Sequence, residues 1–151
     1  MATFISHSPT ETEALGERWG RAAERGLVIG LSGELGAGKT QLVKGLARGL
    51  GIAARVHSPT FTLVNEYSGG RLRLSHLDLY RLESREQIIS AGLEEYLQPD
   101  GVAVIEWAER WFGKLTGVRG QGSGSPARYR HVIIEIVKET ERRIAYEDSG
   151  A

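Results

Sequence analysis

The stretch GELGAGKT, residues 33–40, restricts most strongly what this chain can fold into. A continuous apolar run, LVIGLSG at 27–33, precedes it, and a segment with apolar residues at helical spacing, 39–51, follows it. An apolar run without polar alternation predicts a strand buried on both faces of a parallel sheet. The order of strand, glycine-rich loop and helix therefore predicts an α/β fold built around a phosphate-binding loop.

The spacing G-x-x-x-x-G-K-T predicts a site for a nucleoside triphosphate. Glycines let successive backbone N–H groups surround phosphate oxygens, and the helix that follows adds its positive N-terminal end. Lys39 is expected to reach the terminal phosphates and Thr40 to ligate Mg²⁺ through its hydroxyl. The predicted nucleotide-binding residues of this loop are Gly33, Glu34, Leu35, Gly36, Ala37, Gly38, Lys39, Thr40 and Gln41.

Two acidic residues stand at the ends of predicted strands. Asp78 ends RLSHLDL and Glu106 follows VAVI. Because parallel strands deliver their carboxyl ends to the same sheet edge, both should lie beside the loop. One carboxylate would support the metal and the other would orient the attacking water, and the residues alone do not assign the two roles.

Three further residues could belong to the site. Thr60, in SPTFT, is a possible sensor of the terminal phosphate, and a plain turn hydroxyl is the alternative. Trp107 would cover the nucleotide or simply fill the core. His76 shares a strand face with Asp78 and would support the site, contact a partner or serve structure alone.

Composition excludes several classes of function. The chain has 19 basic and 19 acidic residues, so tight charge-driven binding to a DNA duplex is not expected. It has no cysteine, which excludes disulfides and thiolate chemistry. The sequence lacks an apolar run of membrane-spanning length and a signal-peptide pattern at its start, so we expect a soluble, cytoplasmic protein with no membrane partner.

The remaining pattern predicts a single domain over residues 1–151. Strands are expected at 3–6, 102–107, 129–137 and 142–146, with a hairpin formed by 62–67 and 71–78. Helices are expected from Ser8 to about residue 24 and over 84–97, each begun by a capping box. Residues 114–128 are rich in glycine and serine and are predicted to be a flexible loop. The expected architecture is a P-loop NTPase fold with a central mixed, mostly parallel sheet flanked by helices.

Four segments together resemble the bacterial TsaE (YjeE) family: GELGAGKT, SPTFTLVNEY, HLDLYRL and VIEWAER, which span residues 33–110. The resemblance implies an ATPase with ATP and Mg²⁺ as ligands and with TsaD and TsaB as partner proteins. It also implies a role in threonylcarbamoyladenosine modification of tRNA, with tRNA as an indirect partner. It also implies weak activity alone and a need for hydrolysis in repeated turnover of the complex.

Site roles carry over to the matching positions of this sequence. Lys39 and Thr40 match the phosphate and metal positions, Asp78 matches the acidic residue of the family's H-x-D-L-Y-R segment, and Thr60 matches the switch-like threonine. Glu106 and Trp107 match a pair implicated in metal or water handling and in packing at the nucleotide.

Two other functions remain open from the residues. A small-molecule kinase of the P-loop class would transfer phosphate to an acceptor without partner proteins. A non-catalytic nucleotide-binding module would bind ATP and dock to partners without hydrolysing it.

Overall fold

A single mixed sheet forms the centre of the molecule. The computed structural model describes residues 2–33, 38–57, 62–112 and 128–150, and within these ranges seven strands lie in the order β1-β7-β6-β2-β5-β4-β3. They are β1 (Ala2–Ser6), β2 (Leu27–Gly33), β3 (Val64–Tyr67), β4 (Leu74–Asp78), β5 (Val102–Glu106), β6 (Arg128–Ile136) and β7 (Arg142–Gly150). The central pairs β6/β2, β2/β5 and β5/β4 are parallel, and the outer pairs are antiparallel. The predicted mixed α/β sheet is confirmed, with its parallel part in the middle.

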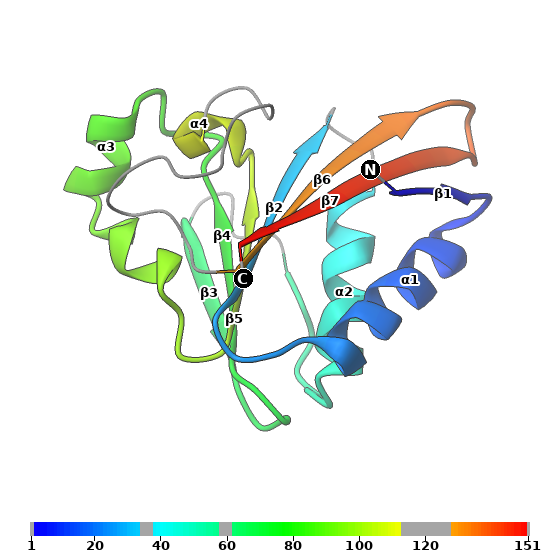
Figure 1. Cartoon of the computed structure of the whole chain (residues 1–151), viewed down its shortest axis with the longest axis horizontal. Coiled ribbons are helices and arrows are strands. Elements are labelled where there is room, and N and C mark those ends of the chain that lie inside the picture. Colours follow the sequence, from blue (N-terminus) through cyan, green and yellow to red (C-terminus); the bar gives the residue numbers. More distant parts are fainter. Residues whose placement is uncertain (1, 34–37, 58–61, 113–127, 151) are drawn as a thin grey trace.

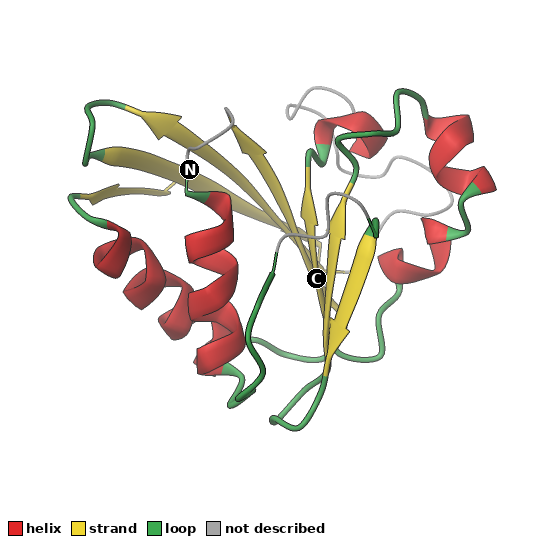
Figure 2. Ribbon diagram, turned by 180° about the vertical axis from the view of Figure 1, so that it is seen from behind, coloured by secondary structure: helices red, strands yellow, loops and turns green. Residues whose placement is uncertain are grey.

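Helices cover both faces of this sheet (Figures 1 and 2). Helices α1 (Pro9–Ala22) and α2 (Lys39–Gly49) lie on one face, and α3 (Arg85–Ser90), the 3-10 helix η1 (Leu93–Leu97) and α4 (Glu109–Phe112) lie on the other. Each face has its own hydrophobic cluster, the first around Leu31 and Leu46 and the second around Ile105 and Trp111. β2 is buried on both sides, as its continuous apolar run predicts.

The two predicted capping residues do cap their helices. Ser8 Oγ accepts a hydrogen bond from the Glu11 N–H at 3.1 Å, and Ser84 Oγ accepts one from the Gln87 N–H at 3.2 Å. The return bond differs from the expected box, because the Glu11 carboxylate accepts from the N–H of His7, the residue before the cap. Gln87 makes the equivalent bond with the residue before Ser84.

The single helix predicted over 84–97 is wrong. α3 stops at Ser90, and Gly92 adopts a left-handed conformation with φ +77° before η1 begins. A left-handed residue cannot continue a right-handed helix, so the segment divides in two.

Several strand boundaries also differ from the expected ones. Leu63 has φ +68°, so β3 begins only at Val64 rather than at residue 62. β4 begins at Leu74 instead of 71, and β5 ends at Glu106 because Trp107 has φ +60°. The short helix α4 was not predicted.

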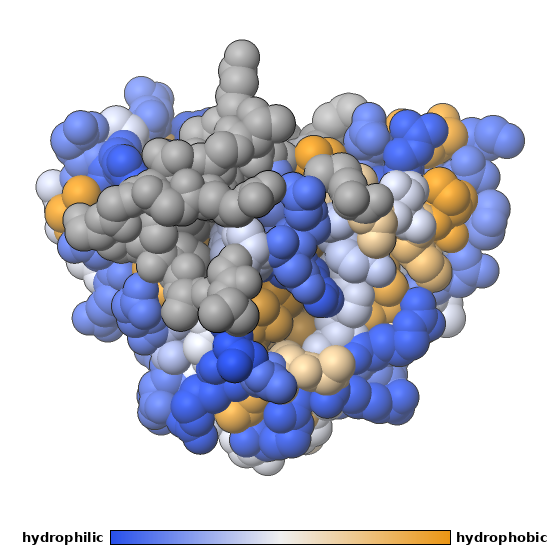
Figure 3. All heavy atoms as spheres, viewed as in Figure 1, coloured by the Kyte–Doolittle hydropathy of each residue, from blue (hydrophilic) through white to orange (hydrophobic). Residues whose placement is uncertain are grey.

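On the face drawn in Figure 3, hydrophilic side chains lie around much of the margin and hydrophobic residues form separate patches between them. Among the described residues, none of the helices has the length and apolar character needed to cross a bilayer. The predicted flexible loop at 114–128 lies outside the described residues except for Arg128, which begins β6 and is therefore not loop. The prediction of a single domain over the whole chain stays a prediction.

Candidate nucleotide site

The first turn of α2 stands at the carboxyl end of β2. Gly38 precedes the helix in a left-handed conformation, with φ +100°, and supplies no side-chain cap. The first N–H groups of any helix have no hydrogen-bond partner within the helix. They form the positive end of the helix dipole. Gly33 ends β2 on the other side of the loop. Residues 34–37, predicted to contact phosphate, lie outside the described residues, as does Thr60.

Lys39 is a buried cation at this point. Its side chain is 5% exposed, and Nζ donates a hydrogen bond to the Gly33 carbonyl oxygen at 2.9 Å. The ammonium also lies 4.2 Å from the centre of the Trp107 ring. Burial lowers the pKa of Lys39 from its ordinary value, whereas nearby carboxylates act to raise it. These are, in decreasing order of effect, Glu106, Glu109 and Asp78.

Asp78 and Glu106 are neighbours across two parallel strands. The two residues are paired in the register of β4 and β5, and Glu106 is paired in turn with Leu31 of β2. Both carboxylates are buried, at 3% and 4% exposure. The register thus brings the two acids together at the carboxyl ends of β4 and β5, as predicted, next to the end of β2. We call this end of the sheet, marked by Gly33, Asp78 and Glu106, the site edge.

Each carboxylate has a different partner. Asp78 Oδ1 accepts a hydrogen bond from the Tyr80 N–H at 2.9 Å, so the backbone of the following loop orients it. Glu106 Oε2 lies 2.5 Å from Nε2 of His76, which is completely buried. One acid is therefore held by the main chain and the other by an imidazole.

Trp107 turns the chain from β5 into α4 with a left-handed backbone. Such a conformation is unfavourable for a bulky residue and is kept only where its surroundings require it. The Tyr80 ring lies 5.0 Å from the indole, and the Arg110 guanidinium lies 5.6 Å from the centre of the indole ring. Trp107 therefore covers Lys39 at the site while also packing against the second hydrophobic cluster.

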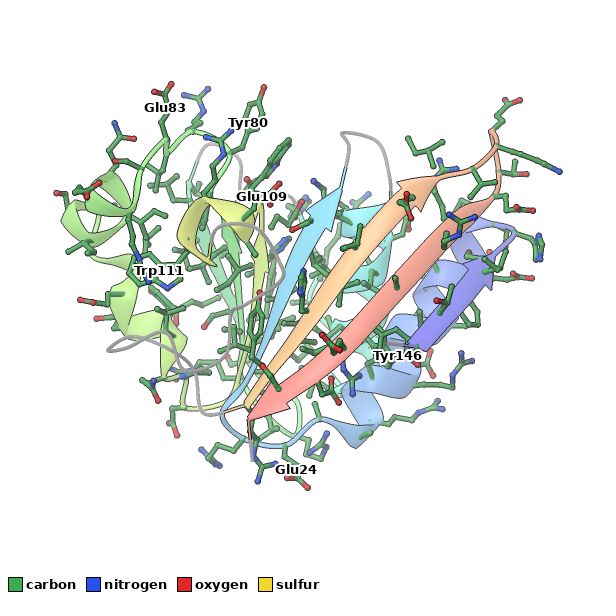
Figure 4. All side chains as sticks on the ribbon, turned by 45° about the horizontal axis from the view of Figure 1, so that its top comes forward. Glu24, Tyr80, Glu83, Glu109, Trp111 and Tyr146 are labelled. Atoms are coloured by element: carbon green, nitrogen blue, oxygen red, sulfur yellow. The ribbon has the colours of Figure 1, made fainter. Side chains whose placement is uncertain are left out.

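The sequence reasoning missed Glu109, a third acid at the site edge. Its Oε1 accepts a hydrogen bond from Ser32 Oγ at 3.0 Å, which joins α4 to the end of β2. Figure 4 shows Glu109 and Tyr80 at the same end of the molecule, opposite to Glu24. The signal in the sequence is an acidic residue three positions after Glu106. In the structure it lies in the first turn of α4, where a carboxylate interacts favourably with the positive end of the helix dipole.

The donors gathered here fit a magnesium-bound triphosphate. The site edge offers a glycine-capped helix N-terminus, a buried ammonium and two buried carboxylates, with half-buried Thr40 and Gln41 in the first helical turn. Within the described ranges, no group of three or more His, Asp or Glu side chains could hold a metal alone. Magnesium that arrives with phosphates needs few protein ligands, so this arrangement suits a metal shared with a nucleotide.

The sheet topology, with β2 followed directly in sequence by α2, defines a protein with a P-loop NTPase-like fold. A family model described as "Threonylcarbamoyl adenosine biosynthesis protein TsaE" matches residues 6–144. The chain therefore belongs to the TsaE family.

Individual relatives agree with this assignment. The tRNA threonylcarbamoyladenosine biosynthesis protein TsaE of Bacillus subtilis is 38% identical, covering 95% of this chain and 83% of the relative. The TsaE protein of Treponema pallidum is 50% identical over 74% of this chain and 82% of its own. The crystal structure of Bacillus subtilis YdiB superposes with a TM-score of 0.75 at 32% identity, covering 99% of this chain and 86% of that one. The chain thus has a role in threonylcarbamoyladenosine biosynthesis.

Proposed function

We propose that this protein is an ATPase that binds and hydrolyses ATP with Mg²⁺. One observation carries the proposal: Lys39 at the start of α2 lies beside Asp78 and Glu106, which the sheet register pairs at adjacent strand ends. A buried cation next to two buried carboxylates is costly unless a ligand uses those charges. The ligand that uses all of them is a triphosphate carrying a divalent metal.

Each residue has a distinct task in the proposed reaction. The backbone from Gly33 to Gln41, including Glu34, Leu35, Gly36, Ala37 and Gly38, binds the phosphates, and Lys39 supplies charge to the terminal ones. Mg²⁺, when bound, neutralises phosphate charge. The Thr40 hydroxyl and one carboxylate are oxygen ligands suited to that ion.

The remaining groups prepare the reaction. The second of the two carboxylates, Asp78 or Glu106, orients the water that attacks the terminal phosphate. Trp107 excludes solvent from the Lys39 ammonium, and Thr60 responds to the terminal phosphate. The backbone bond to Asp78 and the imidazole bond to Glu106 hold these acids in place before ATP arrives.

In the cell, hydrolysis would serve the tRNA-modifying assembly and not this chain alone. Membership of the TsaE family supports TsaD and TsaB as the partner proteins, the cytoplasm as the location, and an indirect relation to tRNA. We propose that ATP hydrolysis renews the TsaB–TsaD complex between rounds of threonylcarbamoyl transfer.

The test is phosphate release from ATP by this protein alone and with purified TsaB and TsaD. We expect slow release alone and stimulation by the partners. Lys39→Ala should lose ATP affinity and activity, because no other described cation occupies the start of α2 beside both acids. Lys44→Ala is the matched control, since Lys44 lies on the same helix but lines a separate groove with Arg48 and Arg55.

Three outcomes would contradict the proposal. ATP binding without phosphate release in the assembled complex would identify a non-catalytic docking module. Transfer of phosphate to a small acceptor, with no effect of TsaB and TsaD, would identify a kinase. Equal activity in the wild type and Lys39→Ala would remove the site altogether.

A further inference from the structure

We infer that His76 is a positioning residue that fixes the Glu106 carboxylate for ATP hydrolysis. The inference rests on the proposed ATPase function. His76 lies in the middle of β4, is 0% exposed and places Nε2 2.5 Å from Glu106 Oε2. An imidazole in the interior of a sheet, joined to an acid of the proposed site, needs a reason beyond packing, because an apolar side chain would fill the same space without a polar group.

The sheet register explains why these two residues meet. His76 is paired with Val104 of β5, and Asp78 is paired with Glu106. Residues two apart on a strand share a face, so His76, Asp78 and Glu106 all lie on one side of the sheet. This is the side covered by α2, since Val104 belongs to the hydrophobic cluster that contains Leu42 and Leu46. The histidine is therefore a diagonal neighbour of Glu106 beneath the nucleotide site.

The hydrogen bond determines how Glu106 is held. A carboxylate accepts hydrogen bonds, so in this contact Nε2 of His76 is the donor and Oε2 of Glu106 the acceptor. The other ring nitrogen, Nδ1, is buried and has no hydrogen-bond partner among the described residues. Among the described residues, Glu106 is therefore the hydrogen-bond partner of the His76 ring.

This contact leaves the second oxygen of Glu106 for the reaction. With Oε2 bound to His76, Oε1 is the oxygen available to a metal or a water. Glu106 also has the largest effect among the carboxylates on the neighbouring Lys39 ammonium. His76 does not itself need to touch ATP, so its loss should change turnover more than ATP affinity. Loss of a partner that orients a ligating or catalytic side chain typically lowers metal affinity or activity by about 10–100-fold.

Two amide substitutions test the geometry. His76→Gln places an N–H₂ group where Nε2 stands, whereas His76→Asn places it where Nδ1 stands and leaves Glu106 without its donor. We expect His76→Gln to keep kcat within about threefold of the wild type and His76→Asn to lower kcat by about 10-fold or more, with ATP affinity nearly unchanged in both. Turnover is measured as phosphate release with TsaB and TsaD, and affinity by titration with ATP and Mg²⁺.

A double-mutant cycle separates positioning from a general structural role. In a Glu106→Gln background, His76→Asn should reduce activity little further, because the group it acts through is already changed. His131→Asn is the control: His131 is also buried, at 5% exposure, but lies on β6, which β2 separates from the strands that carry Glu106 and Asp78, and its substitution should leave kcat per folded molecule unchanged.

The outcomes separate this inference from the proposed function. A wild type that releases no phosphate even with its partners refutes the ATPase itself. An active wild type in which the Asn and Gln variants are equally active, or in which the His76 and Glu106 effects are fully additive, refutes the positioning role alone. Thermal unfolding of each variant provides the folded fraction used to correct kcat.

Discussion

The site edge and the β6–β7 hairpin both carry charged side chains, and the two regions differ in how far those side chains are exposed to solvent. At the site edge, Lys39, Asp78 and Glu106 are each at most 5% exposed. On the hairpin, Arg130 binds Asp148 through two hydrogen bonds of 2.6 and 2.9 Å, and the Asp148 side chain is 61% exposed.

This difference separates charges that a fold needs from charges that a reaction needs. An exposed ion pair remains largely hydrated and contributes little to stability in either direction. A buried ammonium or carboxylate loses its hydration, which is expensive unless the charge is used. Of the two regions, only the site edge carries this cost of lost hydration. The conclusion is that the charges of the site edge should control activity and those of the hairpin only local stability.

The largest expected effect comes from removing one buried acid. Glu106→Gln and Asp78→Asn keep the side-chain volume but remove the charge, and each should lower ATP turnover by about 100-fold or more. The variant that keeps ATP and Mg²⁺ affinity identifies the water-orienting acid, and the one that loses Mg²⁺ dependence identifies the metal ligand. Phosphate release with TsaB and TsaD, together with ATP titrations at several Mg²⁺ concentrations, provides the measurement.

Asp148→Asn is the matched control on the hairpin, because it makes the same carboxylate-to-amide change on an exposed acid. It should leave turnover at the wild-type rate. If both site-edge amides kept full turnover, or if Asp148→Asn lost as much as they do, the distinction between the two regions would be wrong.

A second test lies where the two regions join, at Gly30 of β2. A Cβ atom at this position would lie 1.9 Å from the Tyr129 hydroxyl oxygen and 2.9 Å from Ala108 Cβ. Tyr129 is 2% exposed and has little room to move. Gly30→Ala should therefore destabilise the protein by about 1–3 kcal/mol, the usual cost of overpacking a core.

The clash at Gly30 has its own internal control. Because the nearest atom is the Tyr129 hydroxyl, Tyr129→Phe in the Gly30→Ala background should recover part of the lost stability in urea unfolding. A Gly30→Ala variant as stable as the wild type would show that β2 and β6 are less closely packed than this contact requires.

Local patterns in the sequence predicted much of this architecture. The apolar runs of β2 and β5 predicted buried parallel strands, and a shared direction of β4 and β5 predicted that Asp78 and Glu106 would meet. The glycine-rich loop predicted the start of α2 at Lys39. These succeed because strand burial and helix initiation depend on neighbouring residues.

What could not be predicted depends on backbone conformations and on contacts between distant segments. Nothing in the residue types announces that Leu63 and Trp107 adopt left-handed conformations, so the ends of β3 and β5 were misplaced. The helical spacing of 84–97 predicts Gly92 to be a helix residue. In the structure Gly92 adopts a left-handed conformation, which glycine permits, and α3 ends before it. The partner of His76 lies 30 residues away and follows only from the register of β4 against β5. The contact of Glu109 with Ser32 joins residues 77 apart, and both pairs require the folded sheet to be known.

The smallest expected effect is on the hairpin and depends on pH. Hydrogen bonding to Arg130 holds the pKa of Asp148 below its ordinary value of 3.8. The charged carboxylate therefore stabilises the fold at every pH above its unfolded-state pKa, and this stability disappears as the pH falls through the lower pKa of the folded state. Because Asp148 is mostly exposed, Asp148→Asn should cost no more than about 1 kcal/mol at neutral pH.

That cost should shrink as the pH is lowered below 3.8 towards the folded-state pKa, and also in high salt, which screens exposed pairs. Urea unfolding of the wild type and Asp148→Asn at neutral and acidic pH measures the difference. Arg130 would still lie over the rings of Trp19 and Tyr146, at 4.8 and 5.4 Å, so its charge is not left without a contact in the variant. A loss well above 2 kcal/mol, or one that stays constant at acidic pH, would mean that this pair behaves like the buried charges of the site edge, and exposure would then no longer distinguish the two regions.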